Sequence, residues 1–328
     1  MKNYRQIIIG LIIGTVIGYS VFEIVHEKDL FGLGHIVTMN QEKHEGGGVL
    51  TNPLLECSTA EDDGTYPALN ISKPALTSFV NRMVSTNKID FISVYVRDLN
   101  NGPWIGINEK EEFLGSSLLK VPILISYMKS AENDNSLLDK KIKYTTKVID
   151  DDQYYSPEKV LEVGGEYTVK DLLNYMIYYS DNNAANLLAD SMDNSEMDKV
   201  FEALGLGKPV FNTPYPVNVR NYAGFFRILF NASYVNKEYS EKTLEILTHT
   251  EFNRGLTAFL PKDIVVAHKF GIRSDNGVNQ LHDCGIVYYP EHPYLICIMS
   301  RGRNFDDLAS AIAQISEFVF EEVNGSDK

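Results

Sequence analysis

The chain has 328 residues, 44% of them hydrophobic and 23% charged, which excludes disorder, collagen and coiled coil as its main architecture and fits one large or two small globular domains. Asp and Glu number 44 against 30 Lys and Arg, so the net charge of −14 argues against a nucleic-acid partner. Three cysteines (Cys57, Cys284 and Cys297) are too few for a disulfide scaffold, and their spacing indicates neither zinc nor another metal.

The first 25 residues form a separate hydrophobic segment. Lys2 and Arg5 precede an apolar run from Ile7 to Phe22. About 20 residues are needed to span a bilayer, so the run is slightly short, and a cleaved signal peptide competes with an uncleaved anchor. We favour the anchor, because no small-x-small cleavage site follows the run. The positive-inside rule then predicts a single-pass protein whose remainder lies outside the cytoplasm, whereas signal cleavage would give a secreted protein.

Residues 26–72 resemble a flexible tether. They contain Gly46-Gly47-Gly48, an acidic segment (Glu61-Asp62-Asp63) and little hydrophobic periodicity. Cys57 lies in this stretch, too far from the apolar run to carry a lipid anchor. We therefore expect one folded catalytic domain over residues 73–325.

That domain alternates between strand and helix patterns. Helical spacing is followed by two alternating runs with a turn between them, a mostly helical middle, three candidate strands and a terminal amphipathic helix. The expected elements are 75–87, 89–99, 104–107, 117–129, 144–247, 264–270, 284–289, 294–300 and 305–322. The order predicts an α/β (α+β) fold: an antiparallel sheet flanked by N- and C-terminal helices, with an inserted all-helical lobe. Cys284 and Cys297 fall on neighbouring strands, where we expect buried thiols rather than a bridge.

The spacing of Ser117 and Lys120 indicates an activated hydroxyl. Three residues apart on a helix, the two side chains share a face, and a desolvated lysine can accept a serine proton. The Ser would also lie at the positive end of the helix dipole. The same S-x-x-K pattern occurs at Ser85 and Ser156, but only Ser117 begins an apolar helix.

Two further motifs follow in the chain. Ser180-Asp181-Asn182 separates two helical runs and by itself is typical of a helix cap. Lys269-Phe270-Gly271 ends a predicted strand, where a lysine is usually just solvated.

The order of S-x-x-K, S-D-N and K-x-G resembles the signature of penicillin-interacting serine enzymes. The runs from Tyr155 to Leu188 and from Gly255 to Lys269 resemble the corresponding runs of class A β-lactamases. The chain is thus similar to the class A β-lactamase-like and penicillin-binding serine D,D-peptidase superfamily over about residues 74–323. The resemblance implies a bacterial, cell-wall-related enzyme.

The resemblance implies a role for each motif residue. Ser117 would be the acylated nucleophile and Lys120 its general base, while Ser180 would pass a proton to the leaving nitrogen. Asn182 would bind the substrate's amide, and Lys269 its carboxylate. Gly271 and Tyr155 would lie at the substrate site, Tyr155 at its mouth. The N–H groups of Ser117 and Ile272 would form the oxyanion hole. Asp181 is expected to be a structural cap. No cofactor is implied.

Two departures from the family pattern stand out. Phe270 replaces the Thr whose hydroxyl helps to bind the substrate carboxylate, and Arg273 could compensate with a bidentate contact. No Asp or Glu occurs between Ala203 and Lys237, where class A β-lactamases carry the glutamate that activates the deacylating water. The residues for acylation are present, and the usual base for hydrolysis is not.

These observations favour a membrane-tethered serine hydrolase that forms an acyl-enzyme with β-lactams or peptidoglycan stem peptides and deacylates slowly. A non-catalytic module that binds wall peptides or senses β-lactams is the alternative, and Phe270 is the feature that supports it. The intact serines and lysines of the three motifs argue against it.

Overall fold

The computed structural model describes residues 49–52, 71–85, 89–100, 103–147, 155–209 and 215–325. The expected anchor at residues 1–25 and nearly all of the expected tether lie outside these ranges. Among the helices described, none is both long and apolar enough to cross a membrane.

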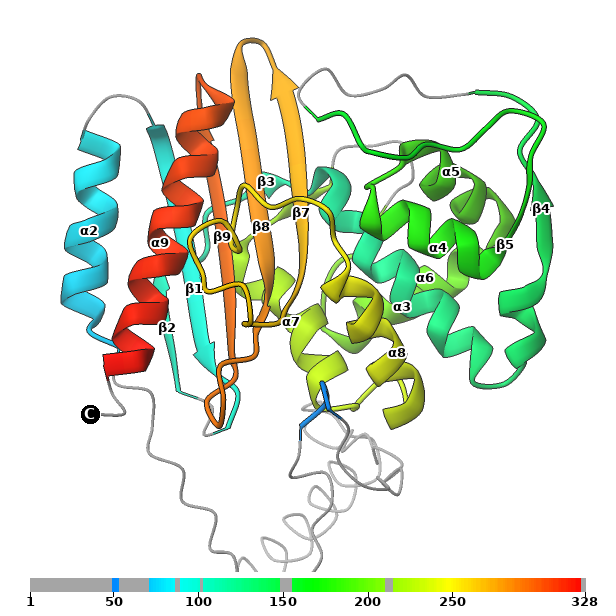
Figure 1. The fold of residues 1–328 in the computed structure, drawn as a ribbon, viewed down its shortest axis with the longest axis horizontal. Helices are drawn as coiled ribbons and strands as arrows, with labels where there is room; N and C mark the ends of the chain where they lie inside the picture. Colours follow the sequence, from blue (N-terminus) through cyan, green and yellow to red (C-terminus); the bar gives the residue numbers. More distant parts are fainter. Residues whose placement is uncertain are drawn as a thin grey trace, which may run out of the picture. The chain divides into compact units, whose positions relative to one another are not determined.

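A five-stranded antiparallel sheet forms the centre of the domain (Figure 1). The strand order is β2-β1-β9-β8-β7, so the last strand pairs with the first. The strands are β1 (Ile89–Asp98), β2 (Trp104–Ile107), β7 (Val266–Asp275), β8 (Val278–Val287) and β9 (Tyr294–Gly302). The predicted antiparallel sheet is confirmed, and β7 and β2 are its two edges.

Two helices cover one face of the sheet. Helix α2 (Lys73–Ser85) and helix α9 (Phe305–Gly325) lie side by side on it, as Figure 1 shows. Their apolar faces share a buried cluster with alternate residues of the strands, among them Val94, Ile296 and Ile298. The terminal helices thus close the sheet from the side opposite the helical lobe.

The second face carries the helical lobe. Its helices and short strands pack around a larger apolar core that includes α3 and α7. The lobe contains β3 (Phe113–Leu114), η2 (Ser116–Leu119), α3 (Lys120–Ala131), η3 (Asn135–Asp139), β4 (Lys141–Lys143), β5 (Glu166–Thr168), α4 (Val169–Tyr178), α5 (Asn182–Ser191), α6 (Asn194–Ala203), β6 (Pro216–Val217), α7 (Val219–Phe230) and α8 (Lys237–Thr248). The predicted α/β class with flanking helices and an inserted helical lobe is confirmed.

Strand β8 begins six residues before the predicted strand at 284–289. Residues Asn276 and Gly277, with φ of 51° and 78°, form the tight turn that joins β7 to β8. Asn-Gly is the pair that two-residue hairpins favour, because both central residues need positive φ. The strand therefore begins at Val278, and the Ser274-Asp275-Asn276 run belongs to a hairpin.

Cys284 and Cys297 form a disulfide, which corrects the expectation of two free thiols. They are direct partners in the β8–β9 register, with α-carbons 4.0 Å apart. Two cysteines opposite each other on adjacent antiparallel strands come close enough to bridge, which sequence spacing alone could not show. The third cysteine, Cys57, lies outside the described residues.

Candidate active site

The candidate active site lies where β7 passes η2. Six residues line a shallow cleft there: Ser116, Ser117, Lys120, Asn182, Ile272 and Arg273. They come from η2, α3, α5 and β7, which are distant in sequence. Five of these six residues are sequence-predicted site residues, so the fold brings together motifs up to 156 positions apart.

The first motif begins just before helix α3. Ser117 lies in the 3₁₀ turn η2, and the α-helix itself starts at Lys120. Ser116, directly before Ser117, has a φ of +48°, a conformation that non-glycine residues rarely adopt. Such strain is characteristic of functional sites. Ser116 also lines the cleft, and nothing in the sequence marked it, because backbone strain leaves no residue signature.

Lys120 connects the first motif to the second. Its buried Nζ donates to Ser180 O at 2.5 Å, to Ser180 Oγ at 3.1 Å and to Asn182 Oδ1 at 2.7 Å. Ser117 Oγ has no hydrogen-bond partner in the described part of the chain and faces the cleft. The lysine therefore links helix α3 to the S-D-N turn.

The S-D-N turn is held by its middle residue. Asp181 caps α5 by accepting from Ala184 N at 2.8 Å, and its second oxygen accepts from Leu161 N at 3.2 Å. This confirms the predicted capping role. Ser180 has a φ of +53°, so the cap holds this residue in an unusual conformation from which its side chain meets both lysines.

Lys269 lies on the other side of Ser180. Its Nζ donates to Ser180 Oγ at 2.9 Å and to Phe270 O at 2.9 Å. The side chain is fully buried, and burial lowers its pKa well below the ordinary value, aided by the neighbouring Lys120 charge and opposed by Asp283. A buried amine that sheds its proton readily can exchange protons with the serine hydroxyl between the two lysines.

Gly271 allows β7 to approach the η2 turn. A Cβ at this position would lie 3.0 Å from Leu118 Cγ and 3.3 Å from both Gly115 O and Leu118 N. Two of those atoms are backbone and cannot move aside cheaply. The glycine of the K-x-G motif is thus required for close packing, and Leu118 is a site neighbour that the sequence reading did not name.

The Phe270 side chain packs away from the cleft lining. Its ring is 1% exposed, stacks on Phe252 at 4.2 Å between centroids and meets Tyr155 edge-on at 4.8 Å. Lys269 Nζ lies 3.9 Å from the centre of the same ring. Phe270 therefore forms an apolar wall of the Lys269 site as part of an aromatic cluster.

Tyr155 belongs to that aromatic cluster. Its hydroxyl donates to Glu251 Oε2 at 3.0 Å, and burial together with this carboxylate raises the pKa of Tyr155. Tyr155 is not among the six residues that line the cleft, and its predicted place at the mouth of the site stays a prediction. Arg273 and Ile272, in contrast, lie in the cleft as predicted.

The segment before α7 runs beside the η2 turn. Strand β6 pairs with β3 through Phe113–Val217 and Leu114–Pro216, and Gly115 N donates to Tyr215 O at 3.0 Å. No acidic side chain lines the cleft among the described residues. The stretch from Ala203 to Lys237, where class A β-lactamases carry the glutamate for deacylation, therefore brings no carboxylate to the cleft.

The fold and the serine–lysine–serine–lysine arrangement are typical of serine hydrolases of β-lactamase type. Residues 75–323 match the family described as the β-lactamase enzyme family. The chain belongs to that family and is a serine hydrolase of β-lactamase type.

Individual relatives are distant. The chain is similar to a β-lactamase of Phocaeicola vulgatus, with 24% identity over 300 residues that cover 83% of this chain and 91% of the relative. A shorter stretch of 140 residues is 31% identical to a carbapenem-hydrolyzing β-lactamase, KPC, of Klebsiella oxytoca, covering 41% of this chain and 44% of the relative.

Solved structures show the same fold. A β-lactamase from Chitinophaga pinensis superposes with a TM-score of 0.65 at 20% identity, covering 75% of this chain and 98% of its own. The protein PBP-A superposes with a TM-score of 0.63 at 22% identity, covering 76% and 97%.

Proposed function

We propose that this enzyme forms an acyl-enzyme at Ser117 with β-lactams or D-alanyl stem peptides and releases the acyl group slowly. The observation that carries the proposal is the position of Ser180 Oγ, 3.1 Å from Lys120 Nζ and 2.9 Å from Lys269 Nζ. One hydroxyl between two amines provides a route by which a proton can pass between Lys120, Ser180 and a leaving group bound beside them.

In the proposed acylation, unprotonated Lys120 takes the proton of Ser117 Oγ as this oxygen bonds to the substrate's carbonyl carbon. The N–H groups of Ser117 and Ile272 stabilise the resulting oxyanion. The carbon–nitrogen bond then breaks, the nitrogen takes a proton from Ser180 Oγ, and Ser180 regains one from Lys120. Arg273, at the cleft, is the proposed partner of the substrate carboxylate.

The slow second half of the cycle follows from the missing base. General-base assistance contributes about 10²–10⁴-fold to such a step. Glu158 and Glu162, in the loop before the S-D-N turn, are the other candidate bases. Both are exposed, and neither lines the cleft. A variant of the structural relative PBP-A has been solved as an acyl-enzyme complex with penicillin G, which supports β-lactams as acylating substrates of this fold.

The experiment is labelling with a fluorescent penicillin followed by a chase with unlabelled drug. We expect a label that persists for minutes and maps to Ser117 by peptide mass spectrometry, with no label in Ser117→Ala. Ser85→Ala and Ser156→Ala, in the two other S-x-x-K sequences, serve as matched controls and should label normally.

Two outcomes would contradict the proposal. A label lost within seconds would indicate a dedicated β-lactamase with a base that the described cleft does not contain. Failure of the wild type to label, together with no release of D-alanine from stem peptides, would favour the non-catalytic binding module.

We also propose that residues 1–25 anchor the enzyme in the membrane with the catalytic domain outside the cytoplasm. The Cys284–Cys297 disulfide supports this placement, because disulfides persist mainly in oxidising compartments. A C-terminal reporter that is active only in the cytosol should stay dark in the native host, and a bright reporter would refute the topology.

A further inference from the structure

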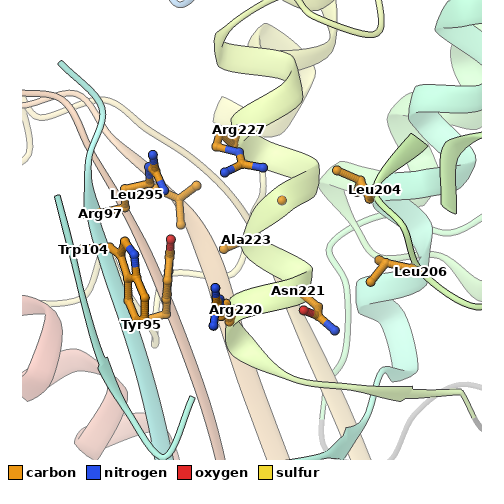
Figure 2. Close-up of a pocket in the computed structure, with 11 residues that line it drawn as sticks. Tyr95, Arg97, Trp104, Leu204, Leu206, Arg220, Asn221, Ala223, Arg227 and Leu295 are labelled. Atoms are coloured by element: carbon orange, nitrogen blue, oxygen red, sulfur yellow. The ribbon is translucent and has the colours of Figure 1, made fainter. Parts of the chain in front are cut away.

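A second concave site lies at the opposite edge of the sheet from the cleft. Figure 2 shows this groove, of about 180 Å³, between strands β1 and β2 on one side and helix α7 on the other. Strand β7, which carries Lys269, is the other edge of the same sheet. The groove is therefore separate from the candidate active site. Ligand binding in it is independent of the proposed acyl transfer at Ser117.

Three arginines and no acidic residue line the groove. Arg97 comes from β1, and Arg220 and Arg227 come from α7. None of the three guanidinium groups has a hydrogen bond or ion pair to any residue that the structure describes. Three positive charges in one groove repel each other, and they are unexpected on a chain with a net charge of −14. This arrangement is the electrostatic complement of a multiply charged anion.

An aromatic pair forms the floor at the sheet side. Tyr95 stacks on Trp104 with 5.5 Å between ring centroids, and the Arg220 guanidinium lies 4.8 Å from the Trp104 ring. Tyr95 is buried, whereas Trp104 is 40% exposed. The indole therefore orients one guanidinium without neutralising its charge.

The spacing of the arginines indicates an extended ligand. Arg220 and Arg227 are seven residues apart on one helix, so their backbones are about 10 Å apart at a rise of about 1.5 Å per residue. In Figure 2 Arg227 and Arg220 lie one above the other along α7, and Arg97 lies across the groove on β1. Cationic side chains anchored at this separation suit a ligand that carries anionic groups along its length.

We propose that this groove binds a ligand built from successive phosphate groups, either a free oligophosphate or a phosphodiester-linked polymer. Guanidinium groups bind phosphate oxygens in a planar, bidentate geometry, and all three cations of the groove are arginine rather than lysine. Asn221 adds an uncharged amide at the rim.

The chain contains a single tryptophan, so Trp104 fluorescence reports directly on the groove. Full-length protein is titrated with tripolyphosphate, with orthophosphate and with an oligomer of glycerol phosphate. We expect saturable changes in emission, with tripolyphosphate or the oligomer binding at least 10-fold more tightly than orthophosphate. The tighter of the two identifies the source as a free oligophosphate or a phosphodiester chain.

Charge-removing variants test the contacts. Arg220→Gln and Arg227→Gln should each weaken binding about 10-fold or more, because a hydrogen bond to a charged group is lost. Arg82→Gln removes the same charge from an exposed residue of α2, which packs with α9 on the other face of the sheet, and it should leave binding unchanged. Penicillin labelling at Ser117 should be the same in all of these variants, which separates this proposal from the acylation proposal.

Four results would overturn the proposal. One is equal weakening by Arg82→Gln, which would indicate non-specific charge attraction, and another is no saturable binding of any phosphate probe. The third is tighter binding of an oligoglutamate peptide than of either phosphate chain. A combined Glu61→Gln, Asp62→Asn and Asp63→Asn variant tests whether the chain's own acidic segment occupies the groove. If Trp104 emission and phosphate affinity are unchanged in this variant, the ligand is external. A large rise in affinity would instead identify that segment as the occupant.

Discussion

Lys269 Nζ donates a 2.9 Å hydrogen bond to Ser180 Oγ from a fully buried position. The centre of the Phe270 ring lies 3.9 Å from Lys269 Nζ, and the ring helps to shield this nitrogen from water. The contact joins the second and third motifs of the site, 89 positions apart, and it makes the protonation of one lysine depend on the packing of its neighbours.

The first prediction concerns pH and stability. The folded pKa of Lys269 lies well below its ordinary value of 10.5, so between these two values the unfolded chain binds a proton that the folded chain does not. Stability therefore rises with pH across that window, and the contribution is lost as pH falls toward the folded pKa. Urea unfolding at pH 7 and pH 10 should show the wild type gaining stability relative to Lys269→Met.

The exposed Lys262 gives the matched control, and Lys262→Met should follow the wild type at both pH values. The prediction is wrong if the difference in unfolding free energy between the wild type and Lys269→Met is the same at pH 7 and pH 10. That result would show that folding does not lower the pKa of Lys269. Because the same variant breaks the contact with Ser180, acylation should also fall by about 100-fold.

The second prediction concerns Phe270. The sequence alone suggested that a Thr hydroxyl here would restore carboxylate binding, but the side chain packs against Phe252 and Tyr155. Phe270→Thr should therefore destabilise the fold by about 3 kcal/mol through the cavity that it leaves, without faster penicillin labelling. Phe270→Leu, which keeps more of the volume, should lose less. Faster labelling in Phe270→Thr would instead place that side chain at the substrate.

The third prediction tests the close approach of β7 to η2. Gly271→Ala should slow acylation by about 10-fold or more, because the new methyl group meets Gly115 O and Leu118 N at 3.3 Å. The overpacking should cost about 1–3 kcal/mol of stability. Gly207→Ala, where a Cβ meets nothing within 4 Å, is the control. Labelling rates by stopped flow decide the matter, and equal rates in both variants would remove Gly271 from the site.

The fourth prediction concerns the disulfide. Intact-mass analysis with alkylation should find Cys284 and Cys297 unavailable until a reductant is added to the unfolded protein. Replacing both with Ala should cost about 2–4 kcal/mol in urea unfolding, since the bond restricts the unfolded chain. Cys57→Ser should have no such effect. Alkylation of Cys284 or Cys297 without reductant would show that the bond is not formed.

The sequence alone was sufficient for the sheet, its flanking helices and the three motifs. Alternation and helical spacing are local patterns, so β1, β2 and α9 could be placed within a few residues. The motif serines and lysines could be named because their order along the chain is itself distinctive. Local pattern also carried enough information to favour Ser117 over Ser85 and Ser156, since only Ser117 precedes an apolar helix.

Only the tertiary structure decided what those residues touch. The direction of the Phe270 side chain, the pairing of Cys284 with Cys297 and the positive φ of Ser116 depend on strand register and backbone conformation. The arginine groove likewise brings Arg97 together with Arg220 and Arg227, which are more than 120 positions away. Such contacts are set by how distant elements pack, and no local pattern of residue types records that packing.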